Sequence, residues 1–177
     1  MEIELIKASK NDARLIFDSW GYNHENFRYL SSTPQNNVED AQKYLERILV
    51  NEDDIAFHIR DSDSTQILGI IKAKVEGHRA LVGFVVDKPF WGKGVATTAV
   101  LKFIPVLKQN KVITRVWATC AIDNPGSIKV LTKCGFLREG ILKHWVIYPA
   151  QGEIAHDNFS FYLKSDDKEP KSLQDNI

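Results

Sequence analysis

The order of the apolar segments constrains the fold of this chain most. Three β-rich segments follow one another in quick succession, at residues 55–60, 67–75 and 81–86. Short polar turns connect them, one at 61–65 and one around Gly77. Strands joined by such short turns pair antiparallel, so this stretch predicts an antiparallel meander.

The remaining segments alternate between helical and extended patterns. We expect strands at 2–7, 112–119, 136–147 and 156–164, and helices near 10–18, from 37 onward, at 93–109 and at 125–134. Ser9 or Asn11 would cap the first helix, and residues 19–35 read as irregular. Pro105 should kink the third helix or divide it. Alternation after the meander predicts one mixed sheet with a parallel pair near its middle.

Length and charge limit the possible functions. The 177 residues suit one domain, 1–164, followed by a polar tail at 165–177 that we expect to be disordered. Because 23 Lys and Arg balance 23 Asp and Glu, no global field attracts nucleic acid or a membrane. Cys120 and Cys134 lack metal-ligand spacing, so no metal is expected. Without a signal peptide or a long apolar stretch, we expect a cytoplasmic protein.

A glycine-rich turn after the third meander strand is the clearest candidate binding site. The strand ends at Val85-Val86, and Pro89 prevents it from continuing. A helix begins after Gly92-Lys93-Gly94. Glycines allow a tight turn, and the unpaired N–H groups of a helix N-terminus bind phosphate. The Rossmann pattern fails at Thr97 and the Walker pattern has no match, so a purely structural turn explains this segment equally well at this point.

A second segment carries strong local signals for a helix. Asn124 suits the N-cap, Pro125 the first helical position and Gly135 the left-handed position after the helix. Lys129 and Lys133 share one helix face, either as solvated side chains or as phosphate ligands.

Together, the two segments resemble the GNAT superfamily of N-acetyltransferases. Residues 91–96 resemble its pyrophosphate motif Q/R-x-x-G-x-G/A, with Gly94 and Ala96 at the small positions. Trp91 replaces the leading Arg or Gln, as is common in the RimJ/RimL branch. Residues 123–136 resemble the signature D-N-x-x-S-x-x-x-x-x-K-x-G-F. The resemblance covers about residues 1–164 and implies about seven strands, about four helices and a splayed parallel strand pair.

The resemblance also implies acetyl-CoA as cosubstrate and assigns residues to it. Asn124 would contact the pantetheine arm, and Ser127 would lie near the thioester sulfur. Backbone N–H groups around Phe84–Val86 would stabilise the oxyanion. The residues implied to bind the cosubstrate are Val85, Val86, Trp91, Gly92, Lys93, Gly94, Val95, Ala96, Thr97, Asn124, Ser127 and Lys133.

The catalytic groups follow less directly. Leu131 stands where many relatives carry a tyrosine acid, so Ser127 becomes the candidate that protonates the thiolate, or simply a residue of the first helical turn. Asp157 and Glu153 in the final hairpin are the candidate bases. Other titratable groups lie nearby in the sequence: Glu139, His144 and His156.

Three functional hypotheses remain at this stage. The first is an active N-acetyltransferase, monomeric or homodimeric, whose acceptor is a protein or peptide N-terminus or a small amine. The second is a non-catalytic acetyl-CoA-binding module of the same fold. The third, an unrelated nucleotide-binding enzyme, is disfavoured because both nucleotide patterns fail.

Overall fold

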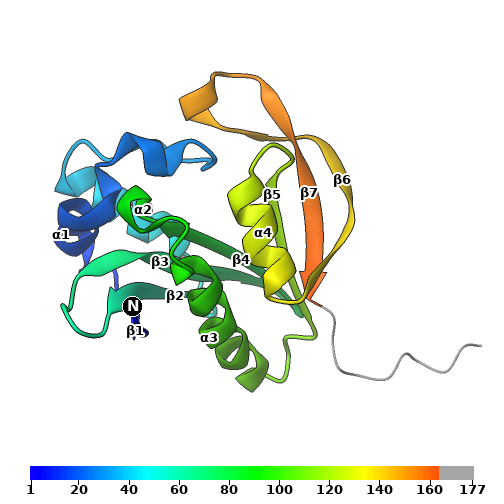
Figure 1. Cartoon of the computed structure of the whole chain (residues 1–177), viewed down its shortest axis with the longest axis horizontal. Coiled ribbons are helices and arrows are strands. Elements are labelled where there is room, and N and C mark those ends of the chain that lie inside the picture. The colour runs from blue at the N-terminus through cyan, green and yellow to red at the C-terminus, as the bar shows by residue number, and fades with distance from the viewer. Residues whose placement is uncertain (164–177) are drawn as a thin grey trace, which may run out of the picture.

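A computed structural model describes residues 1–163 as one mixed seven-stranded sheet with helices on both faces (Figure 1). The strands are β1 (Ile3–Lys7), β2 (Ile55–Asp61), β3 (Ile67–Glu76), β4 (Arg79–Val86), β5 (Arg115–Ala121), β6 (Phe136–Ile147) and β7 (Ala155–Leu163). The α-helices are α1 (Ala13–Ile16), α2 (Val38–Ile48), α3 (Val95–Gln109) and α4 (Pro125–Lys133). Short helical turns are η1 (Phe17–Gly21), η2 (His24–Phe27), η3 (Lys88–Phe90) and η4 (Pro149–Gln151). The predicted tail at 165–177 lies outside the described residues.

The sheet order is β1-β2-β3-β4-β5-β7-β6. Strands β1 to β4 pair antiparallel, as the short polar turns predict. β4 and β5 form the parallel pair, whose partners run only from Arg79–Arg115 to Leu81–Trp117. β7 then pairs antiparallel with both β5 and β6. The predicted mixed sheet with a central parallel pair is therefore confirmed.

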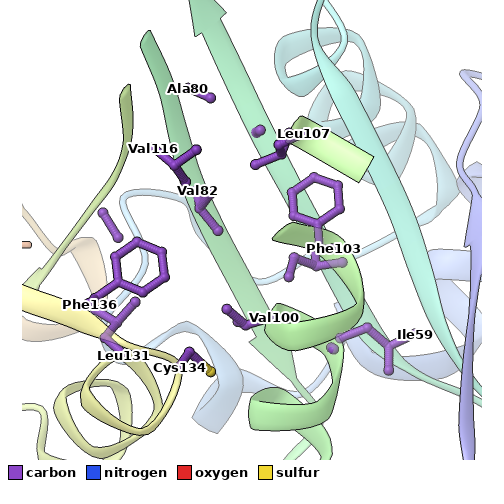
Figure 2. Close-up of a cluster of buried hydrophobic side chains, with 14 of the residues drawn as sticks. Ile59, Ala80, Val82, Val100, Phe103, Leu107, Val116, Leu131, Cys134 and Phe136 are labelled. Carbon is purple, nitrogen blue, oxygen red and sulfur yellow. The ribbon is translucent and has the colours of Figure 1, made fainter. Parts of the chain in front are cut away.

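Two hydrophobic clusters fix the helices to opposite faces of this sheet. Val100, Phe103 and Leu107 of α3 pack on Ile59 of β2 and on Ala80 and Val82 of β4 (Figure 2). Leu131 and Cys134 of the α4 segment join the same cluster. The other face is covered by α1, η1 and α2, whose buried side chains include Ile16, Trp20, Tyr44 and Leu45.

The first helix differs from its prediction. Its N-cap is Asp12, whose carboxylate accepts a hydrogen bond from the Ser9 N–H at 2.7 Å, so neither Ser9 nor Asn11 caps the helix. After Ile16 the chain continues as a π-helix to Gly21. Trp20 is fully buried there, so part of the segment predicted as irregular belongs to the core.

Pro105 does not divide α3, which runs without interruption from Val95 to Gln109. Proline removes the hydrogen bond to the carbonyl four residues earlier, which belongs to Leu101. Leu101 is 50% exposed and Pro105 is exposed as well. Water can therefore reach this side of the helix and solvate the freed carbonyl.

Glycine within a strand is compatible with a bulge, but at Gly83 the β3–β4 register continues unbroken from Gly69–Val86 to Glu76–Arg79. The side chain of Lys72 lies across Gly83 instead, with Cε 3.6 Å from the position that a Cβ would take. Register shifts occur instead between Ile59 and Arg60 of β2 and between Arg138 and Gly140 of β6. The longest one, between Leu142 and Val146, forms a bulge in β6.

Candidate active site

The site begins where β4 and β5 diverge. Along β4, the Asp87 N–H just past the strand donates to Leu68 O of β3 at 2.7 Å, and His78 O just before it accepts from Arg115 N at 3.1 Å. Because bonding direction alternates along a strand, the backbone groups of Phe84 and Val86 face away from β3, toward the side where β5 has separated. Val85, also predicted to contact the cosubstrate, turns its backbone groups toward β3.

A turn rich in unpaired backbone donors follows β4. Within residues 1–163, the N–H groups from Gly92 to Thr97 have no hydrogen-bond partner, and the first helical bond runs from Thr98 N to Gly94 O at 2.9 Å. Gly92 and Gly94 have φ angles of +73° and +83°. A Cβ at either position would meet no atom within 4 Å. The turn is therefore left-handed and open, and it presents donors suited to an anion.

Aromatic side chains hold this turn in place. The indole Nε1 of Trp91 donates to Val86 O at 2.5 Å, while the ring remains 49% exposed. Lys93 Nζ lies 5.4 Å from the centre of the Phe90 ring. Val95 is buried below the turn. Trp91 thus fixes the turn against the end of β4, and Lys93 leaves a cation beside the unpaired N–H groups.

The second segment forms α4 as its capping signals predict. Asn124 Oδ1 accepts from Ser127 N at 3.1 Å, and Asn124 Nδ2 donates to Ser127 Oγ at 3.1 Å. The hydroxyl of Ser127 thus accepts one bond and keeps its own proton available as a donor. Lys129 and Lys133 are exposed on the helix surface.

The sheet topology places the N-termini of α3 and α4 at the same end of the central strands. α3 leads from β4 back to the parallel strand β5, and α4 leads from β5 to β6, which is also parallel to β5. Both helices therefore begin at the carboxyl ends of the diverging strands, which is where ligands bind in α/β sheets. Figure 1 shows the two helices running in the same direction on one face.

Both thiols near this edge are buried and free. Burial raises the pKa of Cys120 to about 12 and also raises the pKa of Cys134. Cys134 Sγ donates to Thr97 O at 3.6 Å, which ties α4 to α3. Such thiols stay protonated and are poor nucleophiles.

The candidate bases differ in their surroundings. Asp157 accepts from Lys143 Nζ at 2.6 Å and from His144 N at 3.0 Å. The Lys143 hydrogen bond, followed by the one from His144, lowers the Asp157 pKa. Both donors belong to the bulge in β6, where His144 has a φ of +48°. Both carboxylate oxygens of Asp157 therefore accept hydrogen bonds that stabilise the bulge.

Glu153 differs from Asp157 in being exposed in the turn between η4 and β7, where no hydrogen bond or ion pair engages it within residues 1–163. Glu139 is occupied elsewhere, because Ser160 Oγ donates to it at 2.7 Å and Arg115 pairs with it. The His156 ring lies against Tyr148, with a ring-centre distance of 5.4 Å and an angle of 50° between the ring planes. Of the two predicted bases, Glu153 is thus the one whose carboxylate has no partner within residues 1–163.

Sequence reasoning missed Asp87, which directly follows β4 and is 9% exposed. Its Oδ1 accepts from Asn23 Nδ2 at 2.8 Å, from Asn26 Nδ2 at 2.7 Å and from Lys88 N at 3.0 Å. An acid between a strand and a proline could have indicated a cap, but its amide partners lie more than sixty residues earlier.

Two further expectations concern metals and membranes. In the described part of the chain, no three His, Cys, Asp or Glu side chains gather as a metal site would require. None of the helices up to residue 163 is long and apolar enough to cross a membrane.

Known proteins share this fold and sequence pattern. The family model for the acetyltransferase (GNAT) domain matches residues 2–137. The uncharacterized N-acetyltransferase p20 of Bacillus licheniformis is 26% identical over 151 residues, covering 81% of this chain and 83% of that protein. The microcin C7 self-immunity acetyltransferase MccE, solved with acetyl-CoA and AMP, has a TM-score of 0.78 at 26% identity, covering 91% of both chains. The ribosomal-protein-S5-alanine acetyltransferase of Vibrio fischeri has a TM-score of 0.79 at 20% identity, covering 96% of this chain and 97% of that one.

Proposed function

The chain belongs to the GNAT acetyltransferase family, and we propose that it moves an acetyl group from acetyl-CoA directly to a primary amine. Residues 1–164 would form the catalytic unit. The observation that carries this proposal is the run of unpaired N–H groups from Gly92 to Thr97, placed beside the divergence of β4 and β5.

The residues at this edge fit the cosubstrate chemically. A pyrophosphate needs several convergent donors, which the turn supplies, and open space, which Gly92 and Gly94 leave. The pantetheine arm would lie along β4, where the Val86 N–H faces the gap, and would reach Asn124. Lys93 and Lys133 would contribute positive charge near the phosphates.

The proposed reaction forms one bond and breaks another. The neutral amine attacks the thioester carbonyl, an N–C bond forms, and the C–S bond then breaks. The N–H groups of Phe84 and Val86 would stabilise the oxyanion. Ser127 would give its hydroxyl proton to the leaving thiolate and take one from water in turn, and the proton lost by the amine would pass to a base. The buried, protonated thiols support direct transfer without an acylated cysteine.

We assign the base to the final hairpin, as the sequence suggests, and favour Glu153 over Asp157. No side chain of residues 1–163 binds the Glu153 carboxylate, whereas Lys143 and His144 both donate to that of Asp157. A low pKa makes a carboxylate a weaker base, which further favours Glu153. Asp157 would act on the amine side only indirectly, by shaping the bulge in β6.

A RimJ/RimL-like placement within the family is supported by Trp91 and Leu131. Trp91 stands at the motif position that is commonly aromatic in that branch, and Leu131 replaces the tyrosine acid. An α-amine, with a pKa near 8, is about 10% neutral at pH 7, whereas a lysine amine is almost wholly protonated. A protein or peptide N-terminus therefore demands less of the base and is the proposed acceptor class, with small amines as the second.

The test is calorimetric titration with acetyl-CoA combined with a coenzyme A release assay on a panel of peptides and small amines. We expect acetyl-CoA to bind and thiol release to depend on the acceptor. Binding without release for any amine would identify a non-catalytic acetyl-CoA module. Absence of binding would contradict the proposal altogether.

A further inference from the structure

A groove of about 790 Å³ opens beside the cosubstrate turn. One wall is the segment from His24 to Pro34, and another is η4. Lys88 and Trp91, which lead into the turn, complete the lining. This volume lies within the range of small-molecule sites. The groove therefore lies beside the turn at which the proposed function places the cosubstrate.

The charges in this groove do not cancel. Glu25 forms an ion pair with Lys88, so these two neutralise each other. Arg28 has no carboxylate partner among residues 1–163. The groove thus carries one uncompensated permanent positive charge.

Both walls of the groove hold Arg28. Its guanidinium carbon lies 5.4 Å from the centre of the Tyr29 ring, and its carbonyl accepts from Gln151 Nε2 at 2.7 Å. Tyr29 in turn packs edge-on against Tyr148 at 6.1 Å, and its hydroxyl donates to Asp123 O at 2.9 Å. The segment bearing Arg28 is thereby fixed to η4 and to the loop before α4. Figure 1 shows this N-terminal segment approaching η4 at the top of the molecule.

We propose that the acceptor of this enzyme carries an anionic group near its amine and that Arg28 binds this group. A guanidinium binds a carboxylate or a phosphate through two parallel hydrogen bonds, which fixes orientation as well as charge. The same charge repels acceptors with a second cationic group, such as polyamines. This inference rests on the proposed acetyl transfer and names the substrate class of that site.

The experiment uses the full chain saturated with coenzyme A, so that no transfer occurs, and measures acceptor binding by calorimetry. The acceptors are tripeptide amides with the same first residue, followed by Asp, phosphoserine, Asn or Lys. We expect an acidic second residue to bind at least about tenfold more tightly than Asn, and Lys to bind most weakly. The Asp and phosphoserine arms distinguish a carboxylate from a phosphate as the natural anion.

Variants of Arg28 provide the second arm. Arg28→Gln should abolish the preference for acidic peptides, and Arg28→Glu should reverse it. Arg14→Gln is the matched control, because Arg14 is exposed on α1 and paired with Asp18 outside the groove. Equal affinity for all peptides, no detectable binding of the acidic ones, or an unchanged order in the Arg28 variants would overturn the inference. Failure of coenzyme A itself to bind would instead contradict the proposed function.

Discussion

Asn26 Nδ2 donates to Asp87 Oδ1 at 2.7 Å, joining the segment after α1 to the end of β4. Asn26 also donates to Trp20 O at 3.0 Å, and its own Oδ1 accepts from Lys88 N at 2.9 Å. Both asparagine and aspartate are buried. One buried network thus fixes the groove wall to the strand that leads into the cosubstrate turn.

Removing the Asp87 carboxylate should therefore affect stability and acceptor binding together. Asp87→Ala removes the acceptor shared by Asn23 Nδ2, Asn26 Nδ2 and Lys88 N, of which the last two keep Trp20 O and Asn26 Oδ1 as partners. We expect it to lower the free energy of unfolding by about 1 to 3 kcal/mol. Asp87→Asn retains an oxygen acceptor and should lose less, while raising the KM for the amine. Urea denaturation and steady-state kinetics measure these effects. Asp18→Ala, in an exposed ion pair with Arg14, is the control and should change stability by less than about 1 kcal/mol.

Gly94→Val should weaken acetyl-CoA binding at least about tenfold, because the side chain enters the open space beside the unpaired N–H groups. Gly77→Val is a matched control. Gly77 also has a positive φ, +60°, and open space around its Cβ position, but it lies in the β3–β4 turn. Both variants bear similar backbone strain, of about 1 to 2 kcal/mol. Calorimetry that finds equal acetyl-CoA affinity in the two folded variants would exclude the turn as the pyrophosphate site.

Ser127→Ala separates catalysis from capping. If Ser127 protonates the thiolate, kcat should fall at least about tenfold while acetyl-CoA affinity changes little. If it only supports the first turn of α4, the loss should be confined to about 1 kcal/mol of stability. Melting temperature and kcat measured on the same variant decide between these outcomes. An unchanged kcat would remove Ser127 from the mechanism.

Lys72 should make stability depend on pH. Burial, reinforced by Arg47, lowers the pKa of Lys72 to about 8, and its Nζ lies 5.5 Å from the centre of the Tyr44 ring. Below pH 8 the lysine is charged in both states, and its burial opposes folding. As pH rises above 8, the folded state releases the proton first, so this penalty decreases until the unfolded lysine also titrates near 10.4.

Replacing Lys72 with methionine should therefore stabilise the protein at pH 7 by about 1 to 2 kcal/mol and by less at pH 9.5. Urea denaturation at both pH values measures the difference. Lys74→Met is the control, since Lys74 is exposed and pairs with Glu76 at 2.8 Å. That control should not stabilise the protein at pH 7. A pH-independent effect of Lys72→Met would contradict the assignment.

The sequence predicted best those features that depend on local signals. Asn124 caps α4 as predicted, and α2 begins where a helix was expected, with Asn37 as its N-cap. Strand β6 has the predicted bounds, 136–147, because an apolar-rich run begins directly after Gly135. The glycine turn was found because only glycine adopts positive φ at low cost.

Features that depend on distant partners were not predictable in this way. The Asp87 network joins residues more than sixty positions apart, and nothing near Asp87 indicates Asn23 or Asn26. The bulge in β6 lacks glycine or proline, so His144 gives no local signal of its positive φ. The hydrogen bonds that Asp157 accepts from that bulge could therefore not be predicted from the sequence.

The short parallel pair between β4 and β5 has a mechanical consequence. Among residues 1–163, only three residue pairs between strands, Arg79–Arg115 to Leu81–Trp117, join the two halves of the sheet. Past these pairs, the backbone groups of β4 that face β5 have no partner in that strand. A cosubstrate lying in the open angle would contact both halves and add to the few hydrogen bonds that join them. The cosubstrate would then serve as a temporary strand, and the amide hydrogens of Phe84 and Val86 would exchange more slowly in its presence.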